Sequence, residues 1–359
     1  MTLNTLRAVL FLVFSVAITN LGFAAQDNDE ENKGFNATEM IMHHVKDAHQ
    51  FHIIDWMEKP VTIALPIILY TDNGLTTFMS SAFHHDDSGT QIVERNGERF
   101  VKFHEKIYQL NAGAETLTFD ADHQPTNAVT PLDFSITRNV FMMWVSVLVL
   151  LLIFITSARK YKKTNNFLPS GIASFVEPLI VFVRDEIAKP MIGENKYKKY
   201  MPFLLTVFFF IWINNIFGLI PILNGANVSG NIAFTLTLAL FTFVITNFSG
   251  NKNYWKHIFW MPGVPVPMKI FLMPIEIIGM FVKPISLTIR LFANITAGHI
   301  IILSLMSLIF IFETWMVAPV SVAFSLFIII IEIVVTAIQA YIFTILSALY
   351  IGMATEDEH

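Results

Sequence analysis

The sequence predicts an all-α polytopic membrane protein of about five transmembrane helices, with one interfacial helix and a small β-rich domain at its N-terminus. Three observations support this fold class. Hydrophobic residues make up 54% of the 359 residues, and charged residues make up only 14%, whereas a soluble domain carries about 25%. The mean hydropathy is +0.57. Long apolar runs are confined to the chain after about residue 133, and a polar segment precedes them.

The net charge and the residue types exclude several classes of function. The net charge is −5, and no basic patch large enough to follow a phosphate backbone is present, so nucleic acid is not an expected partner. The chain has no cysteine, which excludes disulfides and thiolate chemistry. It also carries no nucleotide-binding loop. We therefore expect a protein that is surrounded by lipid and needs no cofactor.

Residues 1–25 are typical of a secretory signal peptide. Arg7 supplies the positive region, Ala8–Leu21 the apolar core, and Gly22-Phe23-Ala24 a small-residue cleavage pattern. The apolar core is short for a span of ~20 residues. Cleavage is therefore predicted, and the segment that follows would lie outside the cytoplasm. The alternative is an uncleaved anchor helix.

Residues 26–133 are predicted to form the β-rich domain, outside the cytoplasm. Asn96-Gly97 is a strong signal for a two-residue hairpin. A helix is predicted near Ala37–His49, because Asn36 can cap it and Glu39 follows three residues later. The predicted strands are Val61–Tyr70, Thr76–Phe83, Thr90–Arg95 and Arg99–Phe103.

Histidines are concentrated in this domain, and a metal site could use them. At a helical spacing of three residues, His49 and His52 could share a face. The candidate metal ligands are His43, His44, His49 and His52. The alternative is a solvated polar face or structural histidines. Because there is no cysteine and no recognisable ligand spacing, we predict that no metal is bound.

The first transmembrane helix is predicted over Asn139–Thr156. A basic cluster follows it at once, consisting of Arg159, Lys160, Lys162 and Lys163. Basic residues mark the cytoplasmic end of a span. The preceding domain is therefore predicted to be external, in agreement with the signal peptide.

Residues 170–190 have the apolar stripe of a helix but carry too many charges to span, so they are predicted to lie on the cytoplasmic face. Four apolar runs follow, over residues 201–220, 231–248, 272–317 and 319–351. The loop at 222–230 and the turn at Ala318-Pro319 contain no basic residue, which places both outside. The membrane domain is thus predicted at residues 134–356, with a cytoplasmic tail at 357–359.

The last two runs are too long for upright spans. At ~1.5 Å per residue, they would form helices of about 70 Å and 50 Å, whereas the hydrocarbon core is ~30 Å thick. They must tilt strongly or break, with Pro284 and Gly298 as candidate kinks. Two long, tilted, antiparallel helices would present a concave face to a neighbour.

Arg290 is the most unusual residue of these runs. A cation at the bilayer centre costs at least ~2.5–3.5 kcal/mol, so an intramembrane arginine predicts a functional site; the alternative is a snorkelling or locally paired arginine. At ~100° per residue, Ser286 and Asn294 lie close to the helix face of Arg290. Gly298 keeps that face small, and His299 lies on the opposite side.

Glu332 is a second ionisable group in apolar surroundings. It shares a helix stripe with Gln339, seven residues on. A buried carboxylate takes up a proton or a partner, and His299 on the facing helix is the obvious candidate. The two could pass a proton near neutral pH. The alternative is a structural buried pair.

These residues resemble subunit a of the rotary F-type ATP synthase. The stretch RLFANITAGH from Arg290 is similar to the arginine signature of that family, and IQAYIFTILSALYIGMA over Ile338–Ala354 is similar to its C-terminal signature. The resemblance covers about residues 134–356. The signal peptide and the histidine-rich domain depart from the common family pattern, which leaves that domain without an assigned role.

The resemblance implies a non-catalytic, proton-translocating stator subunit in a bacterial inner membrane. Arg290 would face a ring of c subunits, and the half-channel that opens outside would hold His299 and Glu332. Asn294 and Gln339 would flank the arginine, and Glu276 and Ser286 would belong to the cytoplasmic half-channel. Further partners would be the b subunits of the peripheral stalk and the rest of the complex.

Physical chemistry supports the role of the arginine. A guanidinium lowers the pKa of a nearby ring carboxylate and cannot itself pass a proton, so it would block a direct leak between the half-channels. One alternative is a secondary transporter that binds an anionic substrate at Arg290, but such folds usually contain an internal repeat, and none is visible. Another is a scaffold built around the external domain, which would leave Arg290, His299 and Glu332 unexplained.

Overall fold

The computed structural model describes residues 46–56, 59–114, 116–120, 125–163, 171–220, 227–312 and 316–356. A β-rich region comes first, and helices follow from Arg138 onward. Within the described residues, four helices are long and apolar enough to cross a membrane, or five if one bent pair counts as a span. The predicted fold class is therefore confirmed. The predicted signal peptide lies outside the described residues.

The described β-rich region consists of antiparallel sheets. One is a hairpin, the second has the order β4-β3-β9, and the third has the order β5-β6-β7-β8. The strands are β1 (Gln50–Trp56), β2 (Lys59–Ala64), β3 (Pro66–Thr71), β4 (Gly74–Met79), β5 (Val93–Arg95), β6 (Glu98–Phe103), β7 (Lys106–Leu110), β8 (Ala128–Val129) and β9 (Leu132–Asp133). Its main core contains Ile67, Leu69, Phe78, Phe83 and Phe100, all buried.

The predicted hairpin at Asn96-Gly97 is confirmed. Strands β5 and β6 pair with Arg95 opposite Glu98, and Asn96 and Gly97 have φ angles of 52° and 76°. Positive φ at both central residues is the geometry that an Asn-Gly turn supplies. These two residues therefore set the register of the third sheet.

Three predicted strands have different bounds in the structure. The one predicted over Thr90–Arg95 is shorter and begins at Val93, as β5. The strand predicted over Val61–Tyr70 is divided into β2 and β3 at Leu65, and the one predicted over Thr76–Phe83 ends at Met79 and continues as a 3-10 turn, η1 (Ser80–Phe83). The cause is a local exchange of hydrogen bonds. The Leu65 N–H donates to Ser80 Oγ, and the Ser80 N–H donates to the Leu65 carbonyl, both at 3.0 Å.

The helix predicted near Ala37–His49 is wrong at its C-terminal end. Residues 46–49 are not helical, and β1 begins at Gln50; residues 37–45 lie outside the described part. The backbone here bonds to the start of the first long helix. The Arg138 N–H donates to the Ala48 carbonyl at 2.8 Å, and the Asn139 N–H donates to Asp47 Oδ1 at 3.0 Å.

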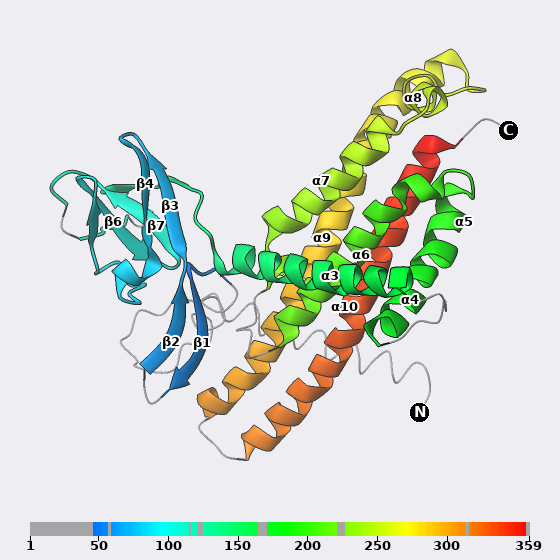
Figure 1. Cartoon of the computed structure of the whole chain (residues 1–359). Coiled ribbons are helices and arrows are strands. Elements are labelled where there is room, and N and C mark those ends of the chain that lie inside the picture. Colours follow the sequence, from blue (N-terminus) through cyan, green and yellow to red (C-terminus); the bar gives the residue numbers. More distant parts are fainter. Residues whose placement is uncertain are drawn as a thin grey trace. The chain divides into compact units, whose positions relative to one another are not determined.

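The helical region is built around two long helices. The elements are α3 (Arg138–Lys163), α4 (Ile172–Phe182), the π-helix η2 (Val183–Ala188), α5 (Lys189–Ile192), α6 (Tyr197–Leu219), η4 (Val228–Gly230), α7 (Ile232–Phe248), α8 (Lys252–Phe259), α9 (Val266–Phe312) and α10 (Val317–Thr355). Helices α9 and α10 lie side by side (Figure 1). Helix α6 packs on α10, and α7 packs on α9.

Both long helices are continuous. Helix α9 has 47 residues and α10 has 39, which correspond to about 70 Å and 58 Å. Helix α9 runs through Pro284 and Gly298, so the chain does not break at either. Thr288 Oγ1 donates to the Pro284 carbonyl at 2.9 Å, and hydroxyl groups of this kind help membrane helices to tolerate proline. Tilt then remains as the way to fit these helices into a core of ~30 Å.

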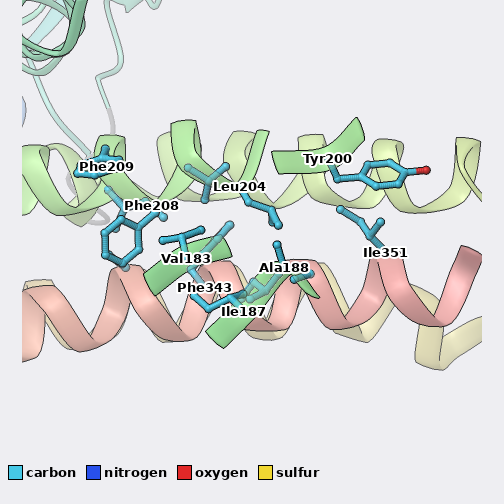
Figure 2. Close-up of a cluster of buried hydrophobic side chains, with 14 of the residues drawn as sticks. Val183, Ile187, Ala188, Tyr200, Leu204, Phe208, Phe209, Phe343 and Ile351 are labelled. Atoms are coloured by element: carbon cyan, nitrogen blue, oxygen red, sulfur yellow. The ribbon is translucent and has the colours of Figure 1, made fainter. Parts of the chain in front are cut away.

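The main core lies between α6, α10 and the η2–α5 segment. Figure 2 shows side chains from these elements, among them Val183, Ile187, Leu204 and Ile351, and all four are fully buried. The apolar stripe predicted for residues 170–190 is thus only partly exposed. In its first half Phe175 is 64% exposed, whereas Ala173 and Val176 are buried, and its second half enters the core as η2.

The C-terminal end of α10 is tied to two other elements. The Asn251 N–H donates to the Ala354 carbonyl at 2.9 Å, and Asn251 Nδ2 donates to the Thr355 carbonyl at 2.9 Å. Lys196 Nζ, just before α6, also donates to the Thr355 carbonyl. These bonds use carbonyl groups that a helix end leaves without an intrahelical partner.

Candidate functional site

Arg290 lies on α9 at the edge of its buried stripe. Leu287 and Leu291 are buried on one side, and Arg290 itself is half-buried. On the other side, Ala293, Asn294 and Ala297 are exposed. We call these three residues the small-residue lane. Because their side chains are short, a neighbouring helix could approach Arg290 closely there.

Glu332 lies against α9 at Gly298. Only 4% of Glu332 is exposed, and a Cβ at position 298 would collide with Glu332 Oε1. Gly298 therefore accommodates the α10 carboxylate. The sequence prediction that Gly298 extends the face of Arg290 is wrong. The physical reason is that eight residues on a helix accumulate a drift of about 80°.

The expected hydrogen bond between Glu332 and His299 is not formed. No described residue hydrogen-bonds either carboxylate oxygen of Glu332. His299 is half-buried and follows directly after Gly298, the α9 residue against which Glu332 packs. Thr296, on the same turn of α9, also has a buried hydroxyl without a hydrogen-bond partner among the described residues.

A line of buried polar side chains continues along α10. Glu332, Thr336 and Gln339 are 4%, 1% and 5% exposed, and their spacing of four and three residues places them on one helix face. Asn215, near the C-terminal end of α6, is also buried. Neither atom of its side-chain amide is hydrogen-bonded to a described residue. We call the set His299, Glu332, Thr336, Gln339 and Asn215 the first polar track.

Arg138 lies near this track. It is 4% exposed, its Nη2 donates to the Lys46 carbonyl at 2.9 Å, and its charge interacts with His299. Ser229, in η4, is also buried, and η4 packs against α9. Sequence reasoning missed Arg138, Ser229, Thr336 and Asn215. The adjacent asparagines at 214 and 215 inside an apolar run were the available signal.

A second polar track lies on the other side of Arg290 along α9. Thr242 Oγ1 and Ser347 Oγ are 3.1 Å apart, and the Tyr254 hydroxyl donates to Asn247 Oδ1 at 3.3 Å. We call the set Thr242, Ser347, Asn247, Tyr254, Lys283 and Glu276 the second polar track. Except for Ser347 and Glu276, its members line a cavity of about 10 Å³, close to the volume that one water needs.

Of the two residues predicted for this side, the structure brings one to the track. Glu276 interacts electrostatically with Tyr254 and Lys283. Ser286 is half-buried on α9 but does not line the cavity. Lys283 Nζ lies 5.3 Å from the centre of the Tyr350 ring. Thr242 and Ser347 could not be selected from the sequence, because single hydroxyl residues are common in membrane helices.

The histidines of the β-rich region do not form a metal centre in the part of the chain that the structure describes. His43 and His44 lie outside the described residues, and His52 is on strand β1 and not on a helix with His49. His49 instead forms a buried ion-pair cluster. Its Nε2 lies 3.0 Å from Asp133 Oδ2, and its Nδ1 lies 3.8 Å from Glu105 Oε2.

This cluster holds charged groups away from water. Burial alone would lower the pKa of His49, but the pairing with Asp133 and Glu105 outweighs it and raises the pKa to about 9. Burial alone would raise the pKa of Glu105, but its pairing with His49 and with the Lys102 ammonium lowers it to about 2. Each charge therefore stabilises the others.

The β-rich region is expected to lose stability at high pH. Since the folded-state pKa of His49 is above its unfolded value, its contribution is complete below about pH 6.5 and is lost as the pH rises through about 9. The loss is on the order of 3 kcal/mol. The urea midpoint of the β-rich region at pH 6 and at pH 9.5, monitored through hydrogen exchange of β3 amides, measures this loss of stability.

His49→Gln is expected to remove the pH dependence, and the exposed control His84→Asn is expected to retain it. A midpoint that does not move with pH in the wild type contradicts the argument.

Comparison with known proteins identifies the family of the helical region. The family model described as ATP synthase A chain matches residues 140–352, and a model described as a domain of unknown function matches residues 40–134. The chain is 49% identical to ATP synthase subunit a of Chloroherpeton thalassium over 246 residues, which are 67% of this chain and 72% of the relative.

Two other relatives extend this similarity. The chain is 47% identical to ATP synthase subunit a 2 of Chlorobaculum tepidum, over 67% of this chain and 70% of the relative. It is 40% identical to ATP synthase subunit a of an Anaeromyxobacter species, over 64% of this chain and 57% of the relative. The residues matched by the family model run from the first turn of α3 to the last turn of α10 and include both polar tracks and Arg290. The chain therefore belongs to the ATP synthase A chain family.

Proposed function

We propose that Arg290 separates two proton paths through this ATP synthase subunit. The observation that carries the proposal is the order of polar groups along α9. Lys283 of the second polar track precedes Arg290 by seven residues, and His299 of the first track follows it by nine. At 1.5 Å per residue these separations are about 10 Å and 13 Å. The two tracks thus approach the arginine from opposite directions.

The first polar track would admit protons from outside the cytoplasm. Its imidazole and carboxylate, His299 and Glu332, are side chains that can take up and release a proton. The basic residues Arg159 and Lys160 at the end of α3 support a cytoplasmic location for that end. By the same rule, the β-rich region is external and the C-terminus is cytoplasmic.

The second polar track would release protons to the cytoplasm. A partner carboxylate that moves past the small-residue lane meets the guanidinium of Arg290 between the two tracks. The positive charge favours the ionised carboxylate and cannot carry the proton across. A proton therefore has to leave on one track and enter on the other, which couples proton flow to movement of the partner. The driving term is about 2.3 kcal/mol per charge for each 100 mV.

The partner implied is a ring of c subunits, small proteins with a membrane carboxylate, with b subunits linking this chain to the peripheral stalk. The small-residue lane is the part of α9 that we assign to the ring. Family membership does not favour the secondary transporter that the sequence left open. Such a transporter would need one central binding site at Arg290, whereas Arg290 lies between two polar tracks.

Site-specific crosslinking tests the assignment of the lane. Because the chain has no cysteine, Ala297→Cys creates a single reactive position on the lane. In membranes that contain the assembled complex, it is expected to crosslink to a small two-helix proteolipid with one membrane carboxylate. The matched control is Leu148→Cys, at an exposed position on α3, which is expected to give no such product. Equal crosslinking from both positions, or none from Ala297→Cys in an assembled complex, contradicts the assignment.

A further inference from the structure

One face of the sheet β4-β3-β9 is apolar and exposed. Five large side chains on it are 47–65% exposed. They are Tyr70, Leu75, Met79, Leu132 and Phe134. We call these residues the apolar sheet face.

The strand registers place these residues on the same side of the sheet. Tyr70 is paired with Leu75 on β4 and with Leu132 on β9. Directly paired residues of antiparallel strands point to the same side, and so do residues two apart on one strand. Met79 is four residues from Leu75, and Phe134 is two residues from Leu132, so all five are on one side.

The opposite side of the same sheet is the core of the β-rich region. Ile67, Leu69 and Phe78 are buried there, and Asp133 reaches His49 from that side. The other positions on the apolar sheet face, by register, are Pro66, Ile68 and Thr77. The face therefore has no charged residue, which is unusual for a sheet surface in water.

The chain connects this face directly to a membrane helix. Strand β9 ends at Asp133, and α3 begins at Arg138. Five residue steps span at most ~18 Å. The exposed side chains of α3 that follow, such as Trp144 and Leu148, are 59% and 58% exposed. The apolar sheet face and the exposed, apolar side of a membrane-spanning helix are thus consecutive in the chain.

We propose that the apolar sheet face rests on the lipid bilayer in which α3 is embedded. Tyrosine and other aromatic residues are enriched at the membrane–water interface, and apolar faces of peripheral elements enter it by ~5–10 Å. The tether keeps the sheet within reach of that interface. The β-rich region is then a membrane-associated collar beside the first helix, and its placement does not depend on the direction of proton flow.

Spin-label accessibility tests this placement in the full chain. Leu75→Cys and Leu132→Cys each give one labelling site in a chain without cysteine. Each variant is labelled with a nitroxide and reconstituted in vesicles of phosphatidylcholine and phosphatidylglycerol. The ratio of oxygen accessibility to water-soluble nickel-chelate accessibility is expected to be at least about fivefold higher at both positions than at the control. The matched control is Glu94→Cys, which is exposed on β5 in the other sheet.

A ratio equal to that of Glu94→Cys would show that the face is in water and would overturn the proposal. Protection from both reagents would show that protein covers the face, and it would also overturn it. A measurement without substitution guards against misfolded variants. In the wild-type chain, a carbene-forming lipid is expected to label the peptides that contain Leu75 and Leu132 and to leave the peptide that contains Glu94 unlabelled. The reverse pattern, or no label in any of the three, counts against the proposal.

Discussion

Replacing Arg290 with alanine is expected to abolish proton-driven ATP synthesis. At ~4 Å and an effective dielectric constant of about 20, the guanidinium stabilises a partner carboxylate by about 4 kcal/mol. Its loss corresponds to roughly a thousandfold weaker bias toward the ionised carboxylate. We therefore expect synthesis in inverted vesicles to fall at least about a hundredfold. Because nothing would then separate the two polar tracks, passive proton leak is expected to rise.

The control for this variant is Lys269→Ala. Lys269 is the first basic residue of α9, lies outside both polar tracks, and stacks over Trp260 with its Nζ 4.5 Å from the ring centre. It is expected to leave synthesis and leak close to wild-type values. Coupled synthesis at a normal rate in Arg290→Ala would end the proposal that this arginine separates two proton paths.

Gly298→Val is expected to reduce proton-driven synthesis by more than tenfold without raising the leak. Any side chain at position 298 occupies the space of the Glu332 carboxylate, so Glu332 must leave its position against Gly298. The first polar track is then interrupted, while Arg290 is unchanged. Synthesis and passive leak in vesicles, normalised to the amount of assembled complex, provide the measurement.

Gly279→Val is a matched control on the same helix, because a Cβ at that position meets nothing within 4 Å. It is expected to have almost no effect on synthesis. Glu332→Gln separates packing from chemistry, since it keeps the shape of the side chain and removes the acid. If Gly298→Val assembles normally and makes ATP at the wild-type rate, Glu332 does not need its observed position.

The sequence was most informative where one residue type is costly in its surroundings. Arg290 and Glu332 stand out as site residues because a charged group in an apolar run is costly. The order of spans followed from the apolar runs, and Asn96-Gly97 specified a hairpin because few residues adopt positive φ easily. In these cases a single local preference determines the structure, and no distant contact can easily override it.

Features that depend on packing between distant elements could not be obtained this way. The role of Gly298 requires the position of Glu332, 34 residues later, and helical phase from Arg290 pointed to the wrong face. The residues before His49 satisfy a helix pattern but bond to the start of α3 instead. Thr242 and Ser347 meet only because α7 and α10 lie together, which neither sequence position indicates.

The bonds at the end of α10 have a mechanical consequence. A ring that turned against Ala293 and Ala297 would push sideways on the long hairpin, and an equal reaction force would bend it. The carbonyl groups of Ala354 and Thr355 are anchored by Asn251 and Lys196. The reaction force would therefore pass from the hairpin into the segments that lead into α6 and α8, and the C-terminal end of α10 would be held in place while the ring turned.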